Sequence, residues 1–220
     1  MLSQTIKPSQ ITLIDAPNGK LEIDAIWQDS DTVAIICHPN PMQGGTMNNK
    51  VVSTLFRYCR DAGMSVLRFN FRGVGASTGV TGNGEGEFID GLTALRYALA
   101  QTGATRVWLG GFSFGGFITC RLAHAVSHDE EFAGLQLAGV ALIAPSIVRH
   151  DTSQLTWQAD STCLIYGQHD ELVAPLALAR FGEHRQIPTS VIDTGHFFHG
   201  KLVELRHALE TYFGKCDEQG

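Results

Sequence analysis

Short apolar, β-rich runs alternate with amphipathic helical stretches along most of this chain, and this alternation constrains the fold more than any other feature. Several runs are almost continuously apolar, as expected of parallel strands that helices cover on both faces. The alternation predicts an α/β fold with a doubly wound, mostly parallel sheet. The expected strands are residues 33–37, 65–70, 106–110, 139–144, 162–166 and 189–192, and the expected helices are 49–61, 88–101, 117–127, 175–184 and 201–213.

The two ends of this pattern add further expectations. Residues 11–16 and 21–27 flank a Pro-Asn-Gly-Lys turn, and Asn-Gly between strand-like runs predicts an antiparallel hairpin at the N-terminus. Residues 147–160 are the only room for an insertion between late strands, and this stretch is too short for a separate lid domain. With 220 residues, the chain is expected to form one domain that covers residues 1–220.

Net charge, the lack of long apolar segments and the cysteine pattern each exclude some classes of protein. The formal net charge is −6 without a Lys/Arg cluster, which argues against nucleic acid or an anionic membrane as the main partner. The first residues lack the apolar core of a signal peptide and no segment reaches the length of a membrane span, so we expect a cytoplasmic protein. The five cysteines are odd in number and lack C-x-x-C spacing, so neither a disulfide framework nor a zinc site is expected.

The pattern G-x-S-x-G, typical of a nucleophilic serine, occurs twice, around Ser77 and around Ser113. Such a serine needs a strand that turns sharply into a helix. Ser113 follows a strand-like run and precedes a helical stretch, whereas the glycines that follow Ser77 cannot start a stable helix. We therefore predict Ser113 as the nucleophile, with the Phe114 amide facing the oxyanion. A tight turn without chemistry is the alternative for Ser113.

Candidates for the base and the carboxylate follow the nucleophile along the chain. A serine hydroxyl needs a base to accept its proton and a carboxylate to orient that base. Asp170 lies in a turn after the next-to-last predicted strand, and His196 follows the last one. The rivals are Asp193, which leaves the same strand as His196, and His199, which we place one turn into the following helix. Asp170 is preferred because it comes from a neighbouring strand and can meet the imidazole side-on.

A second oxyanion donor is expected from the turn after the first parallel strand, which is dense in proline and glycine. Pro39 and Pro41 have no N–H to donate. Asn40 is therefore the nearest candidate, with Gly44 and Gly45 as alternatives.

Phenylalanines flank the predicted catalytic positions. We predict that Phe112 and Phe197 line an acyl pocket, and core packing is the alternative for each of them.

Five segments together resemble one known family: HPNPMQGGTMNNKV, RFNFRGVGASTG, GFSFGG, YGQHDELV and GHFFHGKL. They resemble those of small, lidless bacterial serine hydrolases of the α/β-hydrolase superfamily, related to the dienelactone-hydrolase-like branch. Dienelactone hydrolases proper use a cysteine nucleophile, whereas position 113 is serine. The resemblance implies an α/β-hydrolase fold without a separate lid domain and a Ser-His-Asp triad.

The same resemblance implies hydrolysis of short acyl esters or thioesters through an acyl-serine intermediate. It implies no metal and no organic cofactor. Separately, we expect a small acyl substrate as the partner and a monomer or homodimer. Two alternatives stay open: a non-catalytic interaction protein that retains the fold, and a peptidase for small peptides. The resemblance suggests no catalytic role for Asn70 and a structural one for Arg72.

Overall fold

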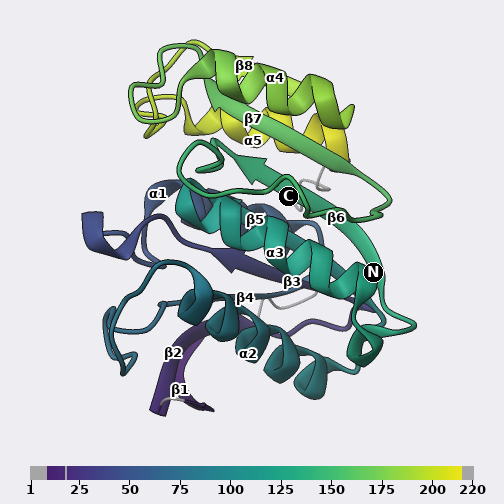
Figure 1. Cartoon of the computed structure of the whole chain (residues 1–220). Coiled ribbons are helices and arrows are strands. Elements are labelled where there is room, and N and C mark those ends of the chain that lie inside the picture. Colours follow the sequence, from purple (N-terminus) through teal and green to yellow (C-terminus); the bar gives the residue numbers. More distant parts are fainter. Residues whose placement is uncertain (1–8, 18, 215–220) are drawn as a thin grey trace.

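A computed structural model of the chain describes residues 9–17 and 19–214. Within them, one eight-stranded sheet has the order β1-β2-β4-β3-β5-β6-β7-β8 (Figure 1). The β1–β2 and β2–β4 pairs are antiparallel and all other neighbours are parallel, which confirms the predicted mostly parallel sheet and its N-terminal hairpin. Asn18 of the hairpin turn lies outside the described residues. The strands are β1 Gln10–Ala16, β2 Gly19–Ile26, β3 Thr32–Cys37, β4 Ser65–Phe69, β5 Arg106–Phe112, β6 Gln136–Ile143, β7 Thr162–Gly167 and β8 Thr189–Ile192.

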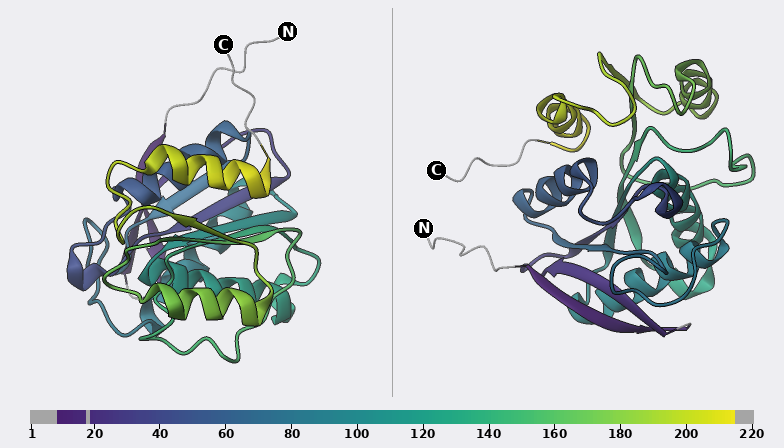
Figure 2. Two further views of the ribbon diagram at one scale, coloured as in Figure 1. Left: turned by 90° about the horizontal axis from the view of Figure 1, so that it is seen from above. Right: turned by 90° about the vertical axis from the view of Figure 1, so that its left-hand side faces the viewer.

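Helices cover both faces of the sheet, as the doubly wound pattern predicts. Figure 2 shows α1 and α5 on one face and α2, α3 and α4 on the other. Two short 3-10 turns, Pro41–Gln43 and Glu130–Phe132, complete the regular structure of the described ranges. The helices are α1 Lys50–Asp61, α2 Glu85–Thr102, α3 Phe114–His128, α4 Pro175–Arg185 and α5 Leu202–Phe213.

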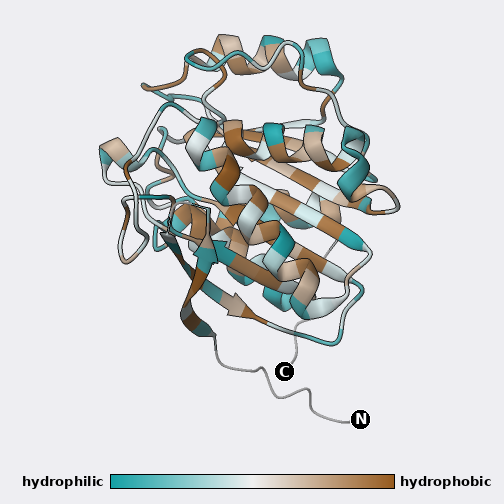
Figure 3. Cartoon of the chain, turned by 60° about the horizontal axis from the view of Figure 1, so that its bottom comes forward, coloured by the Kyte–Doolittle hydropathy of each residue, from teal (hydrophilic) through white to brown (hydrophobic). Residues whose placement is uncertain are grey.

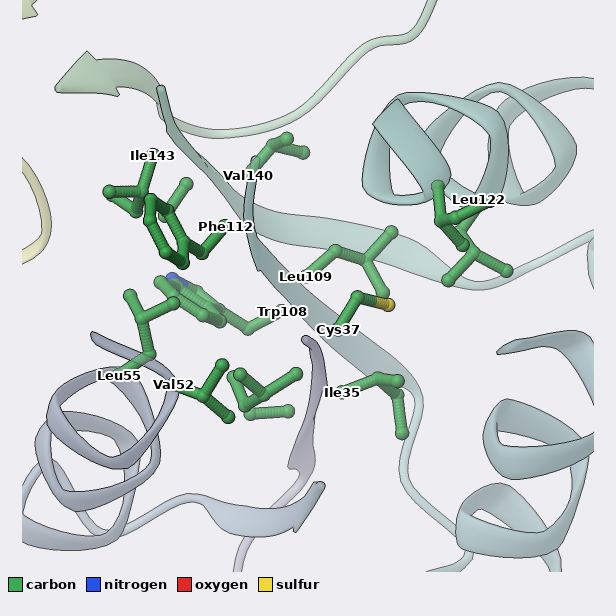
Figure 4. Packing of buried hydrophobic residues seen from close by; sticks show 14 of the residues in the cluster. Ile35, Cys37, Val52, Leu55, Trp108, Leu109, Phe112, Leu122, Val140 and Ile143 are labelled. Atoms are coloured by element: carbon green, nitrogen blue, oxygen red, sulfur yellow. The ribbon is translucent and has the colours of Figure 1, made fainter. Parts of the chain in front are cut away.

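The core lies along the central strands, where apolar residues are concentrated (Figure 3). Trp108 of β5 is 1% exposed and lies among Val52, Leu55 and Phe112 (Figure 4). A Cβ atom at Gly139 on the neighbouring strand would lie 2.4 Å from the Trp108 ring. The indole thus fills space that the neighbouring glycine leaves open, so this glycine is part of the core packing.

The connection between β6 and β7 contains neither a helix nor a strand, so no separate lid domain is inserted there. Arg185 of α4 holds this connection by donating to the carbonyl oxygens of Leu155, at 2.6 Å, and Thr152. Its guanidinium also lies over the Trp157 ring, 5.3 Å from the ring centre. The β6–β7 connection that covers this edge of the sheet is therefore a short loop held in place by Arg185.

No helix in residues 9–17 and 19–214 is both long and apolar enough to cross a bilayer. The cysteines in the same ranges, Cys37, Cys59, Cys120 and Cys163, are buried and form no disulfide. Cys216 and the C-terminal tail lie outside the described residues.

Candidate active site

Ser113 occupies the sharp turn between β5 and α3, in a backbone conformation that non-glycine residues rarely adopt, with φ 54° and ψ −116°. Its N–H donates to the Ile143 carbonyl at 2.9 Å, and its own carbonyl accepts from Gly116 and Ser146 at 2.9 and 3.0 Å. A strained residue persists only where its surroundings fix it, at a cost of about 1–3 kcal/mol, and such strain clusters at active sites. The turn therefore presents Ser113 at the carboxyl end of β5.

The first turn of α3 packs directly against the end of β3. A Cβ atom at Gly115 would lie 2.3 Å from the Cys37 carbonyl oxygen and 2.5 Å from that of His38. Only glycine permits this approach, because those contacts are backbone atoms that cannot move aside. As a result, the helix N-terminus that carries the Phe114 amide lies beside the loop that carries Asn40.

Hydrogen bonding within that loop separates the candidate oxyanion donors. Gly44 donates to the Pro41 carbonyl and Gly45 to the Asn40 carbonyl, each at 3.0 Å. Across the described part of the chain, no acceptor takes the N–H of Phe114 or of Asn40. Among the predicted donors, these two N–H groups are therefore the ones that no acceptor in the described residues occupies.

His38 fixes the shape of the same loop. Its Nδ1 lies 2.7 Å from the Pro39 carbonyl, and its Nε2 lies 3.0 Å from the Phe71 nitrogen. Complete burial lowers the pKa of the imidazole to about 4. His38 is therefore neutral at physiological pH, donating through Nδ1 and accepting the Phe71 N–H at Nε2.

Asp170 and His196 meet at the carboxyl ends of β7 and β8. His196 Nδ1 lies 2.7 Å from Asp170 Oδ2, with the two side chains 1% and 0% exposed. The other carboxylate oxygen, Oδ1, accepts from the N–H groups of Leu172 and Val173 at 2.9 and 2.8 Å. With the Nδ1 proton directed at the carboxylate, the neutral imidazole keeps its lone pair on Nε2.

The His196 ring is held in place from several sides. It lies against the ring of Phe112, with centroids 4.9 Å apart, and meets the Phe197 ring edge-on at 5.2 Å. Its backbone N–H lies 3.2 Å from a carboxylate oxygen of Glu171. Phe112 immediately precedes Ser113, so the imidazole lies over the end of the strand that carries the serine. The sequence interpretation missed Glu171, although its position next to Asp170 was a signal.

Both rivals for these positions have other partners. Asp193 is exposed and accepts from His169 Nε2 at 2.9 Å. His199 is exposed and stacks on Phe197, with centroids 5.8 Å apart. The prediction that His199 lies within the last helix was wrong, because α5 begins only at Leu202.

The second G-x-S-x-G serine serves the fold. Ser77 is 6% exposed, and its hydroxyl donates to the Asn70 carbonyl at 2.7 Å and accepts the Glu22 N–H at 2.9 Å. Ser77 thereby ties the loop after β4 to β2. Arg72 in the same loop forms hydrogen bonds with both carboxylate oxygens of Asp90, which raise the pKa of Arg72, and so braces the loop against α2.

Comparison with known proteins agrees with this architecture. The alpha/beta hydrolase fold family matches residues 35–148. The chain belongs to the α/β hydrolase fold family. A serine hydrolase without a lid from Xanthomonas campestris is 35% identical, with a TM-score of 0.80 and 93% of each chain covered.

Two further relatives extend the comparison. An α/β serine hydrolase homologue from Coxiella burnetii is 34% identical, with a TM-score of 0.80, and the match covers 94% of this chain and 98% of that one. An uncharacterised protein from Rickettsia prowazekii is 31% identical over 211 residues, which are 90% of this chain and 86% of the relative. The family resemblance predicted from sequence is therefore confirmed. The similar structures include a serine hydrolase homologue and a serine hydrolase without a lid.

The α/β hydrolase structure corrects one of the predicted pocket residues. Phe112 is 0% exposed, so its ring packs against His196 inside the core and does not line an open pocket. Phe197 is 43% exposed beside His196. Further exposed apolar side chains lie on the loops that follow β3, β4, β6 and β7, namely Met42, Val80, Val148 and Leu172.

Two buried cysteines of this α/β hydrolase are poor nucleophiles. Burial raises the pKa of Cys37 and of Cys120 to about 12, so both thiols are protonated at neutral pH. No group of three or more His, Cys, Asp or Glu side chains in the described ranges is arranged to hold a metal ion. Serine chemistry is the chemistry that the described site supports best.

Proposed function

We propose that this protein hydrolyses short-chain acyl esters or thioesters through an acyl intermediate on Ser113. The observation that carries the proposal is the buried 2.7 Å hydrogen bond between His196 Nδ1 and Asp170 Oδ2. It leaves Nε2 as the only basic atom of the imidazole, above the strand end that presents the serine. A buried His-Asp pair beside a strained serine turn matches the roles of a Ser-His-Asp triad.

In the proposed mechanism, Nε2 of His196 accepts the Ser113 hydroxyl proton while the oxygen attacks the substrate carbonyl carbon. The Phe114 and Asn40 N–H groups stabilise the resulting oxyanion, and Asp170 stabilises the imidazolium. When the intermediate collapses, His196 gives its proton to the leaving alcohol or thiol. His196 then accepts a proton from water as the water attacks the acyl-serine, which releases the carboxylic acid and restores the Ser113 hydroxyl.

The short-chain preference follows from the cover over the site. A methylene group contributes about 0.8 kcal/mol only where protein removes it from water. The β6–β7 connection adds no helix or strand over the site, and Phe197 is the exposed aromatic ring next to His196. We therefore propose that only the first acyl carbons gain binding energy. We further propose a cytoplasmic enzyme, monomer or homodimer, that needs only its small substrate.

The experiment that tests this proposal compares Ser113→Ala with Ser77→Ala, a matched control from the same sequence pattern. Hydrolysis of nitrophenyl acetate and butyrate is measured, together with labelling by a fluorophosphonate probe. Ser113→Ala should abolish labelling and lower kcat by at least about a thousandfold, whereas Ser77→Ala should keep the label on its folded fraction. If the wild-type protein is folded yet neither labels nor turns over any ester or thioester, the non-catalytic interaction alternative replaces this proposal.

A further inference from the structure

Glu171 joins the two loops that carry the proposed acid and base. It directly follows Asp170 in the loop after β7, and its Oε2 accepts the backbone N–H of His196, at 3.2 Å, from the loop after β8. Glu171 is exposed whereas His196 is 1% exposed, so the carboxylate approaches the buried histidine from the surface. The mechanism proposed above gives this carboxylate no part.

The contact holds a part of the histidine that other bonds between the two loops do not reach. The His169 N–H donates to the Thr194 carbonyl at 3.0 Å, two residues before His196. His196 Nδ1 bonds Asp170 through the end of its side chain. Glu171 holds the backbone between these points, so the three bonds together fix where the imidazole begins and which way it faces.

Gly195, next to His196, leaves the space that this carboxylate occupies. A Cβ atom at Gly195 would lie 2.9 Å from Glu171 Oε2, too close for both atoms to stay in place. The Gly195 backbone is not in the left-handed conformation that favours glycine, so an alanine can adopt it. Because the carboxylate ends a flexible side chain, the alanine methyl group would push it away from the His196 N–H rather than distort the backbone.

The position of a general base strongly affects its rate, and a misplacement of about 1 Å can cost about 10²-fold. A hydrogen bond to an ionised carboxylate is also stronger than one to a neutral acceptor. We propose that Glu171 is a positioning residue for the proposed hydrolysis: its bond to the His196 backbone, in the space left by Gly195, keeps Nε2 directed at Ser113. This inference rests on the proposed function and concerns only the placement of the base.

The kinetic test uses nitrophenyl butyrate and four variants of the full-length protein: Glu171→Ala, Glu171→Gln, Gly195→Ala and the double variant with both alanines. Glu171→Ala should lower kcat by about 10- to 100-fold and leave KM within about twofold, because only the base is displaced. Glu171→Gln keeps an acceptor oxygen at the same reach and should stay within about threefold of the wild-type kcat.

Gly195→Ala should lower kcat as much as Glu171→Ala does, since both substitutions break the same bond. For the same reason, the double variant should be no slower than either single variant. Either single variant suffices if the other fails to fold. Asp193→Ala is the matched control, because this neighbouring carboxylate is exposed and bonds His169 instead of His196, and its kcat should equal that of wild type.

A measurement without substrate separates this inference from the proposed function. The proton on His196 Nδ1 lies in a buried 2.7 Å hydrogen bond to Asp170 Oδ2, so its downfield resonance can be followed by NMR. The resonance should be the same in wild type, Glu171→Gln and Asp193→Ala, and should shift or broaden in Glu171→Ala.

Three results would overturn the positioning role: an unchanged resonance in Glu171→Ala, an equal loss of kcat in Asp193→Ala, or a double variant that loses the product of the two single losses. A wild-type protein that turns over no ester would refute the proposed function, and the NMR comparison would still decide whether Glu171 positions His196.

Discussion

The buried imidazole of His38 makes the stability of the protein depend on pH in a way that can be isolated. Burial lowers the pKa of this group from 6.5 to about 4 in the folded protein, while in the unfolded chain the group titrates at its ordinary value. Between those two pH values the unfolded chain therefore binds a proton at this position and the folded protein does not. Stability from this group is fully present above pH 6.5 and declines as the pH falls toward 4.

The size of the effect follows from this difference in pKa. Each pH unit below 6.5 lowers the free energy of unfolding by up to about 1.4 kcal/mol for one proton. Between pH 7 and pH 5, His38 should therefore reduce the free energy of unfolding by about 2 kcal/mol. His38→Gln removes the titrating group, so this variant should lose about 2 kcal/mol less than wild type over the same interval. Its absolute stability should be lower at pH 7, since the Phe71 N–H loses a well-placed acceptor.

Urea denaturation at pH 7 and pH 5, for wild type and variant, measures both quantities. Subtracting the pH dependence of the variant from that of wild type removes the contribution of every other titrating group that the substitution leaves unchanged. NMR titration of the His38 ring gives an independent measurement, and its resonances should not shift between pH 7.5 and 5. Identical pH dependence in the two proteins, or a His38 ring that titrates near pH 6.5, would refute the reasoning.

Three further predictions concern the proposed reaction. Asp170→Asn should lower kcat by about 10⁴-fold. The protein should stay folded, because the side-chain oxygen of asparagine can still accept from the N–H groups of Leu172 and Val173. Steady-state kinetics and circular dichroism test both points, and a kcat near that of wild type would remove Asp170 from the mechanism. Dialysis against EDTA should leave ester turnover unchanged, because no step uses a metal, and activity that is lost and then restored by zinc would contradict the triad. Across nitrophenyl esters from acetate to palmitate, below their micelle concentrations, kcat/KM should rise by up to about fourfold per carbon at first and then level, whereas a rise through the longest esters would require an enclosed tunnel.

Most strands were predictable because their apolar runs are continuous, but β6 shows where this signal fails. The prediction began at Gly139, whereas β6 begins at Gln136. The register of β6 against β5 shifts between Val107 and Trp108, which pair with Leu137 and Gly139. Such an irregularity breaks the periodicity on which sequence interpretation depends.

Two helix starts were placed three residues too late for a related reason. Glycines at positions 84, 115 and 116 argue locally against a helix. In the structure the Glu87 carboxylate accepts from the Gly84 N–H at 3.0 Å and supports the first turn of α2. Gly115 and Gly116 belong to α3 because the backbone packed against that turn admits no side chain, which is a tertiary cause.

In the candidate site, order along the chain predicted Asp170 and His196, and the structure shows them hydrogen-bonded. The supporting contacts could not be predicted, since they join distant segments: Ser77 to β2, and His38 to the backbone of Phe71. Phe112 was misplaced because β5 continues through it, which turns the side chain into the core.

The contrast between the buried Asp170–His196 pair and the exposed apolar loop residues has a consequence for engineering. Substitutions at the pair would disturb the proposed reaction, and substitutions at the glycines packed against backbone would disturb the framework itself. Met42, Val148 and Phe197 are 75%, 63% and 43% exposed on separate loops that follow β3, β6 and β8. For the proposed ester hydrolysis, a combinatorial library restricted to these three positions should therefore change which esters are preferred at little cost in foldable variants, since the three exposed side chains lie on separate loops.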